Sequence, residues 1–159
     1  MKGFNQFCEQ TKSDVKLLLI GEPMWKNEDT KNIFQKLKYK NRILFLGRKE
    51  IEELTKIAAS AITLTFVPHF EGFGIPLAEA MYCHTPIITS NVSCLPEIAG
   101  NTAIYAKPND INSIADAMEE MYSNNEKRNE LIENCKIRKT AFSWDKSAKE
   151  VWNILKQNW

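Results

Sequence analysis

The segment VPHFEGFGIPLAEAM, residues 67–81, has the pattern of a strand end, a turn with two glycines and the start of a helix. Pro76 suits the first helical turn, where its missing N–H leaves no hydrogen bond unmade. This order places Gly72 and Gly74 at the carboxyl end of a strand and at a helix N-terminus. Glycines there allow backbone angles closed to other residues, and free N–H groups at a helix start attract phosphate. The segment therefore predicts an anion-binding turn.

Two glutamates flank this turn. Glu71 precedes it, and Glu79 lies about one and a half turns inside the helix, so that both carboxylates can face the same crevice. A carboxylate accepts two hydrogen bonds from adjacent hydroxyls, such as those of a sugar or a ribose. Taken singly, each glycine or glutamate fits a plain surface loop or a solvated helix position better than it fits a ligand-binding site. Their combination at the end of a buried strand favours a site for a nucleotide sugar.

Short apolar runs and helical patterns alternate around this segment. Runs typical of buried strands occur at residues 15–20, 43–46 and 62–67, the first read as covered on both faces, and further strands are predicted at 86–89 and 102–105. Helical patterns occupy residues 27–40, 51–61 and 75–82. Three more helices are predicted after Pro108, the last capped by Ser143. Such repeated β-α units predict a parallel sheet with helices on both faces and ligands at the carboxyl ends of its strands.

Composition argues against other classes of protein. With 159 residues, 43% of them hydrophobic and 26% charged, and a net charge of +1, the chain fits one soluble globular domain and not a nucleic-acid-binding protein. No run approaches about 18 apolar residues, the length of a membrane span. Met1 is followed by a polar stretch, so a cytoplasmic location is expected.

No metal site is expected from the cysteines or histidines. Four cysteines without C-x-x-C spacing are predicted to be buried, reduced thiols: Cys8, Cys83, Cys94 and Cys135. His69 and His84 lack the paired ligands of a metal site and are interpreted as loop residues, although His69 could approach a bound sugar.

The sequence resembles the retaining GT-B glycosyltransferases of the glycosyl transferases group 1 family, whose donor-binding domain carries a Glu-x7-Glu motif. Glu71 to Met81 is a nearly complete match to that motif. The similarity covers almost the whole chain, through Phe45-Leu46-Gly47, Glu53-Leu54, Thr85 to Asn91, Leu95 to Gly100, Pro108 and Phe142-Ser143-Trp144. The resemblance implies a Rossmann-like domain, the donor half of a GT-B fold.

The resemblance also implies roles for individual residues. In that family the first glutamate of the motif contacts the donor sugar, so Glu71 is the expected catalytic-site residue. The second glutamate binds ribose hydroxyls, which assigns Glu79 to the ribose. The intervening amides approach sugar and phosphates, which assigns that contact to Gly72, Phe73 and Gly74. The implied donor is a UDP- or GDP-sugar, with retention at the anomeric carbon and no metal or other cofactor; the sequence has no D-x-D motif.

The family also places a lysine on the diphosphate, in a stretch that residues 1–4 resemble, and this implies that role for Lys2. An N-terminal lysine without a ligand is the alternative. One departure is His84, which stands where the family usually has glycine. Another is the pair of residues before Glu71, where the family's Pro-Ser is replaced by Val67-Pro68 or Pro68-His69.

The larger departure is at the beginning of the chain. The family's first strand, its arginine-bearing loop and its separate N-terminal acceptor domain have no counterpart in this sequence. We therefore expect residues 1–159 to form a single nucleotide-sugar-binding domain that lacks this first strand. Such a chain is expected to bind the donor without transferring sugar on its own.

The expected function is the donor half of a hexosyltransferase that serves a glycan or lipid-linked acceptor in cell-surface polysaccharide synthesis, in the cytoplasm or peripherally at the inner membrane face. A noncatalytic nucleotide-sugar-binding or interaction module is the main alternative. A sugar-nucleotide epimerase is a third possibility, but the sequence offers no convincing acid and base pair for that reaction.

Overall fold

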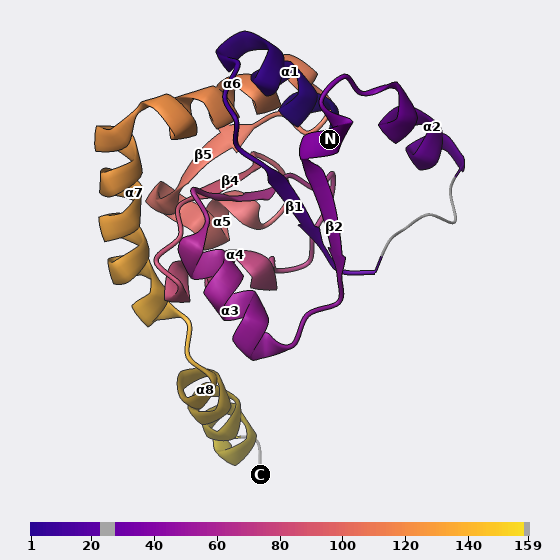
Figure 1. Cartoon of the computed structure of the whole chain (residues 1–159). Coiled ribbons are helices and arrows are strands. Elements are labelled where there is room, and N and C mark those ends of the chain that lie inside the picture. The colour runs from indigo at the N-terminus through magenta and orange to yellow at the C-terminus, as the bar shows by residue number, and fades with distance from the viewer. Residues whose placement is uncertain (23–27, 158–159) are drawn as a thin grey trace.

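The computed structural model describes residues 1–22 and 28–157. The strands are β1 (Leu17–Ile20), β2 (Ile43–Gly47), β3 (Leu64–Phe66), β4 (Ile87–Ser90) and β5 (Ala103–Ala106). The helices are α1 (Lys2–Thr11), α2 (Glu28–Lys36), α3 (Ile51–Ser60), α4 (Ile75–Tyr82), α5 (Leu95–Ala99), α6 (Ile111–Ser123), α7 (Asn125–Arg138) and α8 (Trp144–Gln157). The predicted strands and helices are present, with boundaries shifted by a few residues, and two further helices, α1 and α5, were not predicted (Figure 1). Asn27, the predicted start of the second helix, lies outside the described residues.

All the strand pairings are parallel, which confirms the predicted α/β class. The strands form two separate sheets, because β1 pairs only with β2 and the other three strands pair in the order β3-β4-β5. Among the described residues, no ladder of hydrogen bonds joins β1 to β3. The two sheets nevertheless border one apolar cluster, which includes Ile43 of β2 and Ile88 of β4. The predicted single sheet is therefore divided at its middle.

Helices cover both faces of the three-stranded sheet. Adjacent residues of β4 point to opposite faces, and Ile88 packs in a cluster with side chains of α1 and α6. Ile87 packs in a second cluster with side chains of α4, α5 and α7. All four residues of β4 are buried on both faces, as expected for a strand at the centre of a layered α/β fold.

Strand β1 is less covered than its sequence suggests. Leu18 and Ile20 are 39% and 37% exposed, so the prediction of a strand covered on both faces was wrong for residues 15–20. Leu18 and Ile20 are two residues apart and point to the same face of β1, as does Leu44, the partner of Leu18 in β2, which is 37% exposed. This face of the two-stranded sheet is less covered than the opposite face, whose side chains pack on the apolar cluster.

Side-chain caps begin the helices α6, α7 and α8, and Asn124 caps α7 by accepting from the Lys127 amide at 2.9 Å. The Ser143 hydroxyl accepts a hydrogen bond from the Lys146 amide at 3.4 Å, which confirms the predicted cap of α8. The Asp110 carboxylate caps α6 by accepting from the amides of Asn112 at 3.0 Å and Ser113 at 3.1 Å, a cap that sequence analysis missed.

Helix α8 extends away from the rest of the chain (Figure 1). No residue in its described length is buried, and Trp144 is 88% exposed. Together with Trp144, the exposed apolar side chains of this helix include Val151, Trp152 and Leu155. Residues of α6 and α7 pack in the two apolar clusters that cover the sheet, whereas no described residue of α8 is buried. Within the described part of the chain, no helix is long and apolar enough to cross a membrane.

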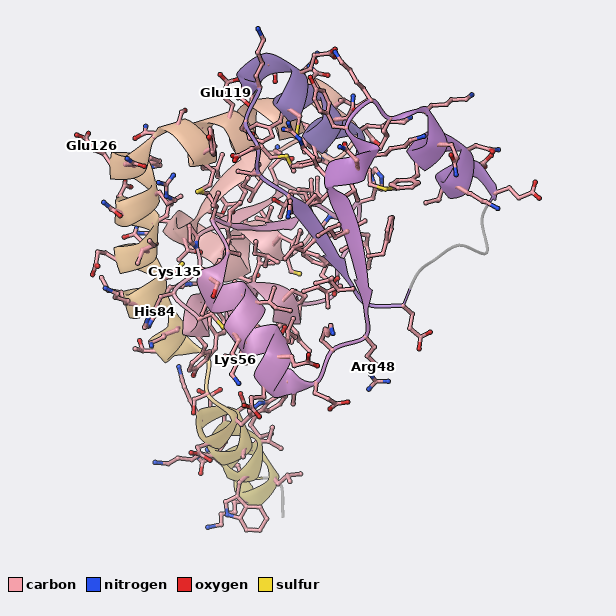
Figure 2. All side chains as sticks on the ribbon, in the orientation of Figure 1. Arg48, Lys56, His84, Glu119, Glu126 and Cys135 are labelled. Atoms are coloured by element: carbon pink, nitrogen blue, oxygen red, sulfur yellow. The ribbon has the colours of Figure 1, made fainter. Side chains whose placement is uncertain are left out.

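The four cysteines are free thiols, as predicted, although only Cys8 and Cys135 are buried while Cys83 and Cys94 are partly exposed. Burial raises the pKa of the Cys135 thiol to about 11. A thiol with so high a pKa stays protonated at neutral pH and is a poor nucleophile. Cys135 therefore serves as a core residue of α7, inside the molecule (Figure 2).

Candidate functional site

The glycine-rich turn connects β3 to α4, and its last residue needs to be glycine for two reasons. Gly74 has φ 90° and ψ 50°, in the left-handed region that side chains disfavour. A Cβ at this position would lie 2.8 Å from Cδ2 of Leu95, which is fully buried. Gly72 differs, because its φ is not in that region and an added Cβ would meet no atom within 4 Å. Only one of the two glycines is thus required by the backbone.

The start of α4 presents amides without protein acceptors. Among residues 1–22 and 28–157, no backbone oxygen accepts from the amides of Phe73, Gly74 or Ile75. Pro76 has no amide hydrogen. The next amide, that of Leu77, donates to the Gly74 carbonyl at 2.9 Å. Free amides at the positive end of a helix can bind an anion. The strand end, the turn and the helix start lie where the sequence predicted them, and anion binding at this turn stays a prediction.

Polar residues at the end of β4 hold the turn in place, and sequence analysis missed them. The buried Thr89 hydroxyl donates to the Phe66 carbonyl at 2.8 Å, and the buried Ser90 hydroxyl donates to the Pro68 carbonyl at 2.6 Å. Beyond the strand, the Ser93 hydroxyl donates to the Glu71 carbonyl at 2.6 Å. The signal in the sequence was the pair of hydroxyl residues at the end of an otherwise apolar strand, since buried polar groups require hydrogen-bond partners.

Glu71 lies folded over the turn. Its side chain is partly buried, and Oε1 accepts a hydrogen bond from the Gly72 amide at 3.1 Å. This bond occupies one of the amides that were assigned to the phosphates. The other carboxylate oxygen leaves Glu71 capacity for a further hydrogen bond.

Glu79 lies on the exposed surface of α4, one turn before Cys83. Burial, and to a lesser degree the charge of Glu79, raise the pKa of the Cys83 thiol. The Cys83 thiol also approaches the carbonyl of Thr55 in α3 at 3.9 Å. Glu79 is thereby placed near the side of α4 that borders α3, and among the described residues no hydrogen bond joins it to Glu71. A crevice shared by both carboxylates stays a prediction.

Lys2 is the exposed first residue of α1. An open depression of about 870 Å³ is lined by Gln6 in the second turn of α1, Asn91 just after β4 and Lys107 just after β5. The N-terminal part of α1 therefore lies at the carboxyl edge of the strands, as the turn does. In the described part of the chain, no hydrogen bond or ion pair links Lys2 to the turn, so its role stays a prediction.

Arg48 extends from the carboxyl end of β2, away from the sheet (Figure 2). The neighbouring end of β1 is tied to it by a hydrogen bond from the Gly21 amide to the Gly47 carbonyl at 2.9 Å. The carboxyl ends of β1 and β2 are thus held together.

The histidines have different surroundings. His84 follows α4 with φ 56°, which explains physically why glycine suits this position. Its Nε2 lies 2.7 Å from Nζ of Lys139 (His84 is labelled in Figure 2). His69 is exposed before the turn. Among the described residues, no group of three or more His, Cys, Asp or Glu side chains is arranged to hold a metal ion.

Comparison with known proteins places this geometry in context. Residues 1–138 match the family model described as glycosyl transferases group 1. The O-antigen chain mannosyltransferase B of Escherichia coli is 28% identical over 147 residues, which are 92% of this chain and 39% of that protein. The sucrose-phosphate synthase of Thermosynechococcus elongatus superposes with a TM-score of 0.83 at 24% identity, over 98% of this chain and 41% of its own.

A third protein, HepE of Anabaena, was solved in complex with UDP-glucose. It superposes with a TM-score of 0.85 at 19% identity, over 98% of this chain and 44% of its own. The chain thus spans less than half the length of each of these three proteins. The structural likeness confirms the predicted fold class, an α/β domain of the GT-B glycosyltransferase fold.

Proposed function

Because the chain belongs to the glycosyl transferases group 1 family, we propose that it is the donor-binding domain of a glycosyltransferase and holds a nucleoside diphosphate sugar at the turn before α4. The observation that carries the proposal is the left-handed Gly74 at the start of α4, with the amides of Phe73, Gly74 and Ile75 unbonded in the described chain. The HepE complex with UDP-glucose, a protein of the same fold, supports this class of ligand.

In this proposal the diphosphate lies against the amides of the turn and the start of α4, with Lys2 adding a positive charge. Glu79 binds the ribose hydroxyls and Glu71 contacts the sugar. When the bond to the anomeric carbon breaks, negative charge develops on the leaving diphosphate. Oriented amides, the helix dipole and a lysine stabilise that charge electrostatically. The proposed reaction is a transfer with retention that needs no metal ion.

The proposed donor is a UDP- or GDP-sugar. The base would lie along the ends of β1 and β2, with contacts to the main chain near Gly21 and between Phe45 and Arg48. The Escherichia coli relative is an O-antigen chain mannosyltransferase. By this likeness we propose transfer to a glycan or lipid-linked acceptor in cell-surface polysaccharide synthesis, in the cytoplasm and peripherally at the inner membrane face, where lipid-linked acceptors lie.

We further propose that residues 1–159 are one domain from which a central strand is absent. Two observations support this. The divided sheet leaves β1 and β3 with one unpaired edge each among the described residues, while both sheets border the same apolar cluster. A parallel strand between them would unite the sheets.

The acceptor would then be held by a second domain. The exposed apolar side of α8 supports a contact with further protein. The same surface also favours the alternative function, a noncatalytic module that binds a nucleotide sugar and docks on a partner. The two are distinguished by whether a complex that includes the partner transfers sugar.

Glu79→Ala is expected to weaken binding of UDP or GDP by about 1–3 kcal/mol, because it removes a charged acceptor of hydrogen bonds from the ribose. Isothermal calorimetry on the folded chain measures the change. Glu126→Ala is the matched control, since Glu126 is an exposed glutamate of α7 far from α4 (Figure 2). Equal affinities for wild type and Glu79→Ala would remove Glu79 from the ribose role.

Glu71→Ala is expected to weaken binding of the sugar nucleotide and to spare the free diphosphate, because Glu71 contacts the sugar in our proposal. Comparing UDP with UDP-glucose, and GDP with GDP-mannose, by calorimetry gives the difference. The variant Glu71→Gln separates the hydrogen bond from the charge. Its amide oxygen can still accept from the Gly72 amide, while the negative charge is lost. Equal losses for both members of a pair contradict the assignment.

A further inference from the structure

Phe142 lies far from the turn in sequence, yet its ring meets the turn directly. The ring centroids of Phe73 and Phe142 are 5.9 Å apart and their planes are inclined by 89°, an edge-to-face contact. Phe142 follows the 3-10 turn η3 (Lys139–Ala141) and precedes α8. The contact therefore connects the segment between α7 and α8 to the residue in the middle of the turn.

Phe142 is itself firmly anchored. Its carbonyl accepts a hydrogen bond from the Tyr82 hydroxyl at 2.5 Å, and its ring packs on the cluster formed by α4, α5 and α7. The guanidinium carbon of Arg138 lies 5.6 Å from the centroid of the Phe142 ring. Arg138 is fixed in turn, because its Nε donates to the Ile98 carbonyl at 3.2 Å. Phe142 thus gives the more exposed ring of Phe73 a fixed surface to pack against.

Phe73 is the more exposed partner, with 44% of its surface accessible. The ends of the turn have other supports: the Glu71 carbonyl accepts from the Ser93 hydroxyl, and Gly74 packs closely on Leu95. Between these supports, the side chain of Phe73 makes the contact with Phe142. Holding this ring restricts the backbone of Phe73, and hence the direction of its own amide and of the next one.

We propose that Phe142 is a positioning residue, whose edge-to-face contact with Phe73 orients the amides of Phe73 and Gly74 toward the bound diphosphate. The presence of a bound diphosphate rests on the proposed function, whereas the ordering of the turn by Phe142 does not. The contact also ties the turn to the start of α8, so that the segment carrying α8 is linked physically to the donor site.

The first test uses the protein without ligand. Amide hydrogen exchange at Leu77, whose amide donates to the Gly74 carbonyl at 2.9 Å, is expected to be about 3- to 10-fold faster in Phe142→Ala, the range that the loss of one aromatic pair allows. Phe142→Leu, which keeps an apolar side chain on the cluster without the ring edge, should also accelerate exchange. Phe142→Tyr should restore the wild-type rates because it retains the ring.

A general loss of stability must be separated from a loss of positioning. Leu131→Ala opens a space in the other apolar cluster, away from the turn, and lowers stability without touching Phe73. Exchange at Leu77 in this control should match wild type under conditions where both proteins are folded. Equal acceleration in Leu131→Ala and Phe142→Ala overturns the proposal, as does an unchanged rate in Phe142→Ala.

The second test measures binding of UDP and GDP by calorimetry. We expect affinity to fall about 3- to 10-fold in Phe142→Ala and to recover in Phe142→Tyr. Unchanged affinity for a nucleotide that binds wild type would overturn the role toward the diphosphate. If neither nucleotide binds wild type, the proposed function fails, and the exchange experiment still decides whether Phe142 orders the turn.

Discussion

Gly74→Ala is expected to lower the free energy of unfolding by about 2–5 kcal/mol and to abolish measurable binding of UDP and GDP. Placing a side chain in the left-handed region costs about 1–2 kcal/mol. The new Cβ would also lie 2.8 Å from Cδ2 of the fully buried Leu95, and overpacking of this kind typically costs about 1–3 kcal/mol more. Relief of either strain displaces the start of α4, where the proposed phosphate amides lie. Urea unfolding and calorimetry measure the two effects.

Gly72→Ala is the matched control for this prediction. The backbone at Gly72 is outside the left-handed region, and the added Cβ would meet no atom within 4 Å. Its stability should therefore stay within about 0.5 kcal/mol of wild type, as for other surface substitutions. A double variant, Gly74→Ala with Leu95→Val, should recover part of the steric loss and none of the backbone loss. Similar unfolding energies for Gly72→Ala and Gly74→Ala would contradict our explanation.

The turn could be predicted from sequence because its determinants are local. A strand end, glycine, proline and a helix start follow one another within residues 67–81, and each constrains the backbone of its immediate neighbours. The same holds for the Ser143 cap, where a hydroxyl bonds an amide three residues later. Sequence analysis did not distinguish Gly72 from Gly74, since the difference depends on Leu95, which packs against the turn from another helix.

The division of the sheet could not be predicted from the periodicity of apolar residues in the sequence. A short apolar run such as residues 15–20 indicates a strand but carries no information on whether neighbours lie on one edge or both. Nor does it indicate whether one face of the strand is covered or both, and the face that carries Leu18 and Ile20 is partly exposed. In the candidate site, the contact between Phe73 and Phe142 was equally hidden, because it joins segments distant in the chain and either aromatic residue alone fits an ordinary core position.

The placement of the acidic residues is also a tertiary property. Helical spacing puts Glu79 on α4, but the direction in which it lies relative to α3 depends on how those helices pack. Glu79 lies one turn before Cys83, whose thiol approaches the Thr55 carbonyl of α3, and this spacing places Glu79 near that side. Glu71, by contrast, makes a local hydrogen bond to the next amide. Calorimetry on the two glutamate variants therefore tests what neither sequence nor the unliganded fold determines.

The 159-residue chain is expected to bind donor and to transfer no sugar by itself. Transfer requires an acceptor hydroxyl held against the anomeric carbon, and alignment of two reactants contributes about 7–11 kcal/mol to lowering the barrier. The proposed donor contacts Glu71, Gly74 and Glu79 all lie between β3 and the end of α4. The chain spans 39% of the Escherichia coli mannosyltransferase, and we assign acceptor alignment to protein beyond that span. Without it, glycoside formation should be slower by a factor of about 10⁵ or more.

The test incubates the purified chain with labelled UDP- and GDP-sugars and with oligosaccharide or lipid-linked acceptors, and follows products by mass spectrometry. The full-length Escherichia coli mannosyltransferase, assayed with the same donors and acceptors, is the positive control. Slow release of free sugar is compatible with the prediction, because water needs no acceptor site. Robust glycoside formation by the chain alone would show that acceptor alignment is built into these residues or into an oligomer of them. In that case the exposed side of α8 would need another explanation than a contact with an acceptor-binding domain.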